Sequence, residues 1–219
     1  MQPDYTDVTV VLDRSGSMSS IRDDMEGGFS AFVARQQALP GRCLVTMVQF
    51  DSRETEVRYA ARPIGEVGPL GLEPRGGTPL LDATAFAIRT TGERLAAMPE
   101  AERPGQVLVL IITDGQENAS RETTATALRQ MIEHQQRCYQ WEFIYLGANV
   151  DAFAEGGKMG IPAGRNVNFD ADVEGVQASW SVVDQKLAHL RRGDRHHLDF
   201  SPAERKRMKK EKPGGKEPA

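Results

Sequence analysis

The sequence has little that is typical of disulfide-stabilised or membrane-spanning proteins. Cys43 and Cys138 are its only cysteines among 219 residues, and they lie far apart without metal-site spacing. We therefore expect reduced thiols rather than a disulfide or a cysteine-ligated metal. No apolar run approaches the roughly 20 residues of a transmembrane helix. Residues 1–5 contain neither a basic region nor an apolar core, so we expect no signal peptide, no membrane partner and a cytoplasmic protein.

Signatures of two enzyme classes are also missing. No Gly-x-x-x-x-Gly-Lys-Ser/Thr phosphate-binding loop occurs in the chain. A phosphate-accepting aspartate of the haloacid-dehalogenase pattern needs a second aspartate two positions on, but Ser15 stands two positions after Asp13. Ser15 and Ser17 have no histidine nearby in the sequence to act as a base. We therefore expect no enzymatic activity and keep a Mg²⁺-dependent hydrolase or phosphotransferase as the alternative.

Charge is distributed unevenly along a chain of otherwise ordinary composition. Apolar residues make up 39% and charged residues 26%, which is typical of a globular domain. The net charge is −4, yet residues 203–219 carry seven lysines and arginines against three glutamates. We predict one domain over residues 1–195 and a basic, disordered tail over 196–219. Nucleic-acid binding through this tail is a second alternative function.

Strand and helix patterns alternate along the chain, which is typical of a parallel sheet covered by helices. We therefore predict an α/β fold that is Rossmann-like and doubly wound, with a mostly parallel six-stranded sheet, one antiparallel edge strand and helices on both faces. Strands are expected at 6–12, 43–50, 55–59, 106–112, 141–146 and 166–169, and helices at 19–39, 79–98, 120–138, 149–156 and 173–191.

Three separated segments supply oxygen side chains beside these elements. Asp13, Ser15 and Ser17 follow the first strand at alternate positions, and Asp114 follows the most apolar strand. Thr78 ends a long loop rich in proline and glycine. In an open parallel sheet, ligands bind at the carboxyl ends of the strands where the strand order reverses. We therefore expect these five side chains to converge in one crevice.

Hydroxyl and carboxylate oxygens are hard ligands that suit Mg²⁺, Mn²⁺ or Ca²⁺ rather than zinc or copper. We predict Mg²⁺ or Mn²⁺, with Ca²⁺ as a further option. Neutral hydroxyls leave the ion electron-poor, and five protein ligands leave a coordination position open. A carboxylate from a partner would complete such a site.

Together, Asp13-x-Ser15-x-Ser17, Thr78 and Thr113-Asp114-Gly115 resemble the metal-ion-dependent adhesion site (MIDAS) of the von Willebrand factor type A (VWA) domain. The resemblance covers residues 5–192, and Met18 and the Gly76-Gly77-Thr78-Pro79-Leu80 segment are closer to intracellular bacterial members. It implies a protein-binding module whose partner donates an aspartate or glutamate to the metal. It also implies adaptor roles with an AAA+ ATPase or a stress-response complex.

Each segment also has a simpler interpretation. Thr78 stands at a helix N-cap position before Pro79, and Asp82 is an ordinary first-turn acid. Glu117 is typical of a solvated loop, and Asn149 of a turn with a helix cap. Residues that we nevertheless place at the rim or around the ligands of the site are Gly16, Gly77, Asp82, Gly115, Glu117 and Asn149.

Overall fold

Six strands form one sheet in the order β3-β2-β1-β4-β5-β6 in the computed structural model, which describes residues 1–210. All neighbouring strands are parallel except β2 and β3, which pair antiparallel at one edge. The predicted fold class is therefore confirmed. The strands are β1 (Gln2–Asp13), β2 (Arg42–Phe50), β3 (Thr55–Pro63), β4 (Pro104–Thr113), β5 (Glu142–Ala148) and β6 (Asn166–Phe169).

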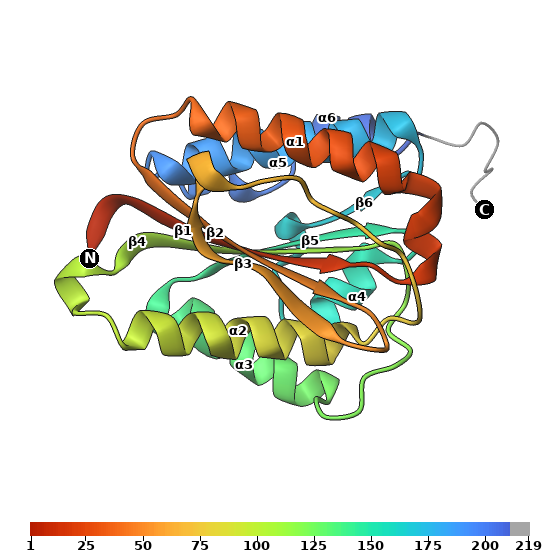
Figure 1. Ribbon diagram of the computed structural model, residues 1–219, viewed down its shortest axis with the longest axis horizontal. Helices are drawn as coiled ribbons and strands as arrows, with labels where there is room; N and C mark the ends of the chain where they lie inside the picture. The colour runs from red at the N-terminus through yellow and green to blue at the C-terminus, as the bar shows by residue number, and fades with distance from the viewer. Residues whose placement is uncertain (211–219) are drawn as a thin grey trace, which may run out of the picture.

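Helices cover both faces of this sheet (Figure 1). One face is covered by α1 (Arg22–Gln37), α5 (Val173–Arg191) and α6 (Pro202–Met208), and the other by α2 (Leu80–Ala96), α3 (Ala125–Tyr139) and α4 (Ala152–Lys158). Short 3₁₀ turns are η1 (Gly16–Ile21), η2 (Ile64–Glu66), η3 (Glu100–Glu102), η4 (Ala163–Arg165) and η5 (His196–Leu198).

The central strands β1 and β4 are buried on both faces, which explains their nearly continuous apolar sequences. Val10 and Leu110 pack into the core beneath α1 and α5, whereas Val11 and Ile111 pack beneath α2 and α3. The two strands pair in register up to Leu12 and Ile112. Their carboxyl ends therefore lie side by side, and this places the candidate site.

Four helices begin later than the sequence predicts, among them α2 by one residue, at Leu80, and α4 by three, at Ala152. The helix expected from residue 19 is a 3₁₀ turn as far as Ile21 and becomes α-helical at Arg22. The helix expected from residue 120 begins at Ala125, because Thr124 caps it by accepting a hydrogen bond from the Ala127 backbone N–H. The intervening segment is a loop, and it borders the candidate site.

The prediction of a disordered tail from residue 196 is wrong as far as residue 208. Leu198, Phe200 and Met208 are buried in the core beneath α5. Ser201 and Glu204 form a capping box that starts α6. Residues 211–219 lie outside the described residues. Within residues 1–210, no helix is both long enough and apolar enough to cross a membrane.

Candidate metal centre

The two aspartates of the candidate site stand at the ends of neighbouring strands. Asp13 is the last residue of β1, and Asp114 follows Thr113, the last residue of β4. The sheet order reverses between these strands, as ligand sites in doubly wound folds require. The Thr113 hydroxyl donates a 2.6 Å hydrogen bond to Oδ2 of Asp13. The convergence that the sequence predicts for these residues is therefore present.

The two serines lie in the turn that follows β1. The Ser15 backbone N–H donates to Oδ1 of Asp13 at 2.6 Å, which folds the turn back over the strand end. The Ser15 and Ser17 hydroxyl oxygens are 3.1 Å apart. The Ser17 hydroxyl donates to Oδ1 of Asp114 at 2.6 Å. Two hydroxyls and two carboxylates thus share one small volume.

Thr78 reaches the same volume from the loop before α2. An ideal Cβ built on Gly115 would lie 3.3 Å from Oγ1 of Thr78, 3.7 Å from Oγ of Ser17 and 4.0 Å from Oδ2 of Asp13. Glycine at position 115 therefore leaves open a space that three of the five candidate ligands surround. The interpretation of Thr78 as a helix cap is wrong, because Pro79 occupies the N-cap position.

This donor set fits a hard divalent cation. Oδ2 of Asp114 is buried and has no hydrogen-bond partner within residues 1–210. A buried carboxylate oxygen without a donor is costly, and a metal ion beside it would remove that cost. The space next to Gly115 and the surrounding hydroxyl and carboxylate oxygens provide room and ligands for such an ion.

Comparisons with known proteins agree with this geometry at the level of the fold. No family model matches the sequence, and no curated protein matches it. Solved structures do match, among them the pilus adhesin SpaC from Lactobacillus rhamnosus GG, with 15% identity, a TM-score of 0.60 and coverage of 84% of this chain and 30% of that chain.

Two further matches identify the fold. Proximal thread matrix protein 1 from the mussel byssus, in a structure with a zinc-occupied MIDAS motif, has 17% identity and a TM-score of 0.59, over 84% of this chain and 46% of that chain. A von Willebrand factor type A protein from Catenulispora acidiphila has 18% identity and a TM-score of 0.54, over 83% and 42%. The fold is that of a VWA domain. The chain spans less than half the length of each of these three proteins.

Burial disfavours the charged forms of the two aspartates, Asp13 and Asp114, in this VWA fold. Burial raises the pKa of Asp13 to about 6, although hydrogen bonds from Thr113 and Ser15 act in the opposite direction and Asp114 adds repulsion. Burial also raises the pKa of Asp114, against the hydrogen bond from Ser17. A cation between the two carboxylates would favour their charged forms.

The glycines predicted at the rim lie around the ligands. The Gly16 backbone N–H donates to the Gly76 carbonyl at 3.1 Å, which joins the serine turn to the loop before Thr78. The Gly77 backbone N–H donates to the Ser52 hydroxyl at 2.9 Å. An ideal Cβ built on Gly77 would lie 2.9 Å from Oδ1 of Asn118, so glycine at this position allows the loop before Thr78 to approach Asn118 closely.

Two predicted rim acids, Asp82 and Glu117, accept hydrogen bonds from the loop after β4. Asp82 accepts hydrogen bonds from the backbone N–H groups of residues 121–123. Glu117 accepts from the backbone N–H groups of Leu81, Ala119 and Ser120. Asp82 at the start of α2 thus holds the loop, and Glu117 in the loop holds the start of α2. The loop after β4 is therefore fixed to this helix.

Asn149 lies just after β5, at the carboxyl end of that strand. It has a left-handed backbone, with φ of 55°. Its side chain lines a separate polar hollow with Gln116, Asn168 and Lys209. Asn149 lies at the same edge of the sheet as Asp13 and Asp114, and its place at the rim of the metal centre stays a prediction.

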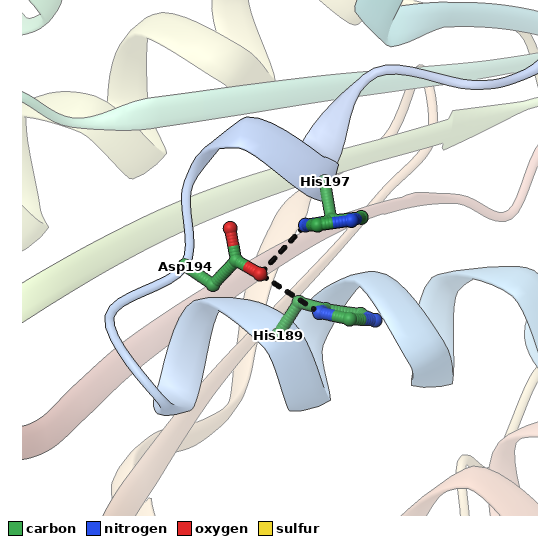
Figure 2. Close-up of side chains that lie close together, drawn as sticks. All are labelled: His189, Asp194 and His197. Atoms are coloured by element: carbon green, nitrogen blue, oxygen red, sulfur yellow. Dashed lines mark hydrogen bonds and ion pairs between the residues drawn. The ribbon is translucent and has the colours of Figure 1, made fainter.

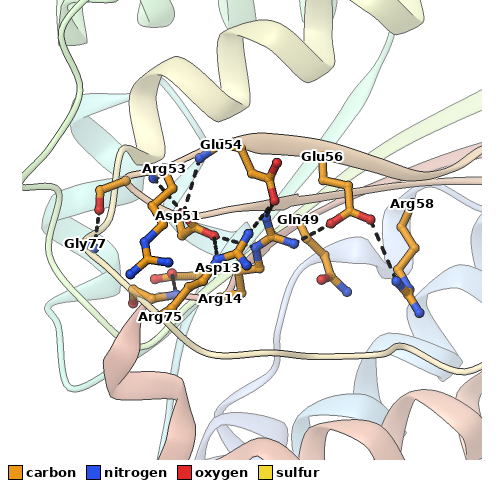
Figure 3. A network of polar contacts seen from close by, with 12 residues as sticks. Asp13, Arg14, Gln49, Asp51, Arg53, Glu54, Glu56, Arg58, Arg75 and Gly77 are labelled. Carbon is orange, nitrogen blue, oxygen red and sulfur yellow. Dashed lines mark hydrogen bonds and ion pairs between the residues drawn. The ribbon is translucent and has the colours of Figure 1, made fainter.

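Sequence reasoning missed an ionic network beside the candidate metal centre (Figure 3). The Nε atoms of Arg14 and Arg75 both contact Oδ2 of Asp51, at 2.7 and 2.9 Å, and both guanidinium groups also pair with Glu54. Burial raises the pKa of Asp51, but the Arg53 backbone N–H and the two arginines outweigh it and lower the pKa overall. The side chains of Arg14 and Asp51 are 4% and 0% exposed.

This network ties together the backbone segments that carry the ligands. Arg14 lies between Asp13 and Ser15, and its carbonyl accepts the Arg75 backbone N–H at 2.8 Å. Arg75 lies three residues before Thr78. Asn118 adds a further link by accepting the Thr78 backbone N–H at 2.9 Å. The basic residue within the Asp-x-Ser-x-Ser motif was the one sequence signal for this arrangement.

Proposed function

We propose that this domain is a metal-dependent protein-binding module without enzymatic activity. Asp13, Ser15, Ser17, Thr78 and Asp114 would hold one divalent cation at the carboxyl edge of the sheet. A partner protein would supply an aspartate or glutamate oxygen to the remaining coordination position. The role is that of an adaptor, and an AAA+ ATPase is the partner class that the sequence resemblance implies.

The unpaired Oδ2 of Asp114 carries this proposal. It is buried beside the Ser17 hydroxyl, Asp13 and the open space at Gly115. Every other oxygen of the two carboxylates accepts a hydrogen bond from this chain. Buried polar groups in folded proteins are nearly always satisfied. A cation that binds Oδ2 would satisfy this one.

The choice of ion follows from the ligands. Hydroxyl and carboxylate oxygens favour hard cations, and Mg²⁺ or Mn²⁺ would retain open or water-filled positions in an octahedral site. Ser17 and Gly16 are exposed, whereas Asp13 and Thr78 are buried. An acidic side chain of a partner would therefore approach the ion from the Ser17 side.

The surroundings of the site support binding rather than acid–base catalysis. Ser15 and Ser17 contact each other and carboxylates that a metal would engage. Three histidines have other surroundings than these serines. His134 borders an apolar pocket with Trp141, and His189 and His197 contact Asp194. A serine nucleophile requires a base within hydrogen-bond reach.

Calorimetric titration of Mg²⁺ and Mn²⁺ would test the metal site. Wild type would bind one ion per chain, and the Asp13→Ala/Asp114→Ala double variant would bind none. Asp23→Ala removes a side chain that is 84% exposed on α1 and serves as a matched control for the loss of charge. Unchanged ion affinity in the double variant would refute the assignment.

Pull-downs from cell lysate would test the adaptor function with the same proteins. Capture of a partner by wild type and Asp23→Ala, lost with EDTA and in the double variant, would support a metal-gated interaction. Mass spectrometry would identify the partner, and substitution of its acidic residues would locate the completing ligand. Capture that persists in EDTA would contradict the metal-dependent mechanism.

A further inference from the structure

Two histidines and an aspartate converge near the end of α5, far in the fold from the oxygen-rich site. Figure 2 shows both imidazole rings directed at the same carboxylate. Nδ1 of His189 lies 3.2 Å, and Nδ1 of His197 2.6 Å, from Oδ2 of Asp194. The two rings stack with centroids 4.5 Å apart and an angle of 17° between their planes. One potential ligand atom from each residue lies within 4.8 Å of the other two.

The local backbone explains why these residues meet. His189 is in the last turn of α5, which ends before Gly193. Gly193 has φ of 80°, a conformation that glycine adopts without strain, and its N–H donates to the Leu190 carbonyl. The Asp194 N–H donates to the His189 carbonyl at 3.0 Å. The reversal at the helix end therefore brings Asp194 back over His189.

The segment that carries His197 is anchored on both sides. Arg195 donates hydrogen bonds to the carbonyls of Gln140 and Gly105. Leu198 is completely buried in the core beneath α5. These contacts hold η5 against the helix, so the three side chains lie on a supported scaffold. Such pre-organisation by packing is what a metal site requires.

The anchors also place this cluster relative to the oxygen-rich site. Gly105 lies at the start of β4, and Gln140 lies just before β5. The cluster is therefore at the amino edge of the sheet, whereas Asp13 and Asp114 stand at the carboxyl edge. Because the length of the strands separates them, the two sites can be altered independently.

The chemistry of the ligands differs between the two sites. Two imidazole nitrogens and one carboxylate oxygen form a donor set for borderline ions such as Zn²⁺, Co²⁺ and Ni²⁺. At Zn–N bonds of about 2.0–2.1 Å, tetrahedral ligand atoms lie about 3.3–3.4 Å apart. The His189–Asp194 separation of 3.2 Å is close to that value. His197 is 62% exposed and is free to withdraw slightly from Asp194.

We propose that His189, Asp194 and His197 form a second metal site that binds Zn²⁺ or a similar borderline divalent cation. The ion joins the end of α5 to η5 and so fastens the segment that leads to α6. With three protein ligands, one or more coordination positions remain for water. This site does not depend on the proposed function of the oxygen-rich centre.

Metal binding at Nδ1 requires a change in both rings. Nδ1 of His189 and Nδ1 of His197 both face Oδ2 of Asp194, and an imidazole that donates to this carboxylate through Nδ1 carries its proton on that nitrogen. When Nδ1 binds the ion, the ring proton resides on Nε2, and no net proton is released from a neutral imidazole. The ¹⁵N chemical shifts of the two ring nitrogens report this tautomer change directly.

Zinc calorimetry on the full chain tests the proposal. The titration uses the Asp13→Ala/Asp114→Ala variant in the presence of excess Mg²⁺. Under these conditions zinc does not bind at the oxygen-rich centre, so the measured heat reports only the second site. One Zn²⁺ per chain is expected. His189→Gln and His197→Gln are each expected to weaken binding by more than ~100-fold, since loss of a ligand exceeds the ~10–100-fold effect of an outer-shell change. His196→Gln, an exposed neighbour outside the cluster, is the matched control.

Two further measurements keep the test decisive. Circular dichroism without metal verifies that each variant folds, and zinc is expected to raise the Tm of the His196→Gln variant but not of His189→Gln or His197→Gln. The ¹⁵N shifts of His189 and His197 are expected to change together on zinc addition. Failure of the folded starting protein to bind zinc at millimolar concentration, or zinc binding that survives both substitutions, would overturn the proposal.

Discussion

The Thr113 hydroxyl at the end of β4 fixes the Asp13 carboxylate at the end of β1 through a hydrogen bond of 2.6 Å. Thr113→Val retains the side-chain shape but removes this donor. We expect metal affinity to fall by roughly 10–100-fold, as it does when an outer-shell partner of a ligand is lost. Isothermal calorimetry with Mn²⁺ measures the effect. Thr91→Val, which removes a buried hydroxyl bonded to Thr9, is the control and should leave affinity unchanged.

Gly115→Ala should abolish metal binding while the domain stays folded. The added methyl group would lie 3.3 Å from the Thr78 hydroxyl and would occupy the space between the ligands. Gly27 on α1 has nothing within 4 Å of a built Cβ, so Gly27→Ala should bind metal normally and gain about 0.5–1 kcal/mol in helix stability. Titration with Mg²⁺ and thermal denaturation of both variants provide the comparison. Normal affinity in Gly115→Ala would contradict the placement of the ion.

Asp51→Asn should weaken both folding and metal binding. The substitution removes the carboxylate that two arginines share in a buried setting, and we expect a loss of about 2 kcal/mol in the free energy of unfolding. Because Arg14 and Arg75 position the ligand segments, metal affinity should fall by roughly 10-fold. The exposed Arg22–Asp23 pair is the control, and its removal should leave the free energy of unfolding nearly unchanged. Urea denaturation and Mn²⁺ calorimetry measure the two effects separately.

Asp82 should make stability depend on acidic pH. Burial raises the pKa of Asp82, but the backbone N–H groups of Arg121, Glu122 and Thr123 outweigh it and lower the pKa below the ordinary 3.8. The stabilisation is therefore complete above pH 3.8 and is lost as the pH falls through the folded-state pKa. At neutral pH, Asp82→Asn should cost about 1 kcal/mol. In urea denaturation, the difference between the two proteins should shrink at acidic pH, and a constant difference would contradict this role.

Met208→Ala should destabilise the domain, because Met208 is 1% exposed and packs in the core beneath α5. We expect a loss of about 2–3 kcal/mol in the free energy of unfolding. Arg207→Ala alters the exposed neighbour and should change stability by less than about 0.5 kcal/mol. Equal, small effects in chemical denaturation would indicate that α6 is not part of the folded domain.

The sheet and the five candidate ligands were predictable because their signals are local. The apolar run before Asp13 and the one before Asp114 each indicate a buried strand with an oxygen ligand at its end. For β6 (Asn166–Phe169) and α5 (Val173–Arg191), the predicted bounds agree with the structure. Periodicity is strong in such segments, and packing preserves what it indicates.

The features that were missed depend on contacts between distant residues. Arg14 and Glu56 are 42 positions apart, and the alternation around Glu56 shows only an edge strand. Asp82 resembles a first-turn acid until the loop after β4 folds back onto it. Residues 196–208 look charged in composition, yet a few widely spaced apolar side chains, including Leu198 and Met208, are sufficient to dock them.

The first described residues lie at the amino ends of the parallel strands, and the last described residues lie at their carboxyl ends. Gln2 pairs beside Pro104 at the start of β4, whereas the Lys210 backbone N–H donates to Asp170 just after β6. Immobilisation on a sensor surface through the amino terminus therefore leaves the carboxyl ends of the strands, where Asp13 stands, directed toward the solution. A linker joined at residue 210 starts on the edge that a partner must approach, and is expected to slow or block its arrival.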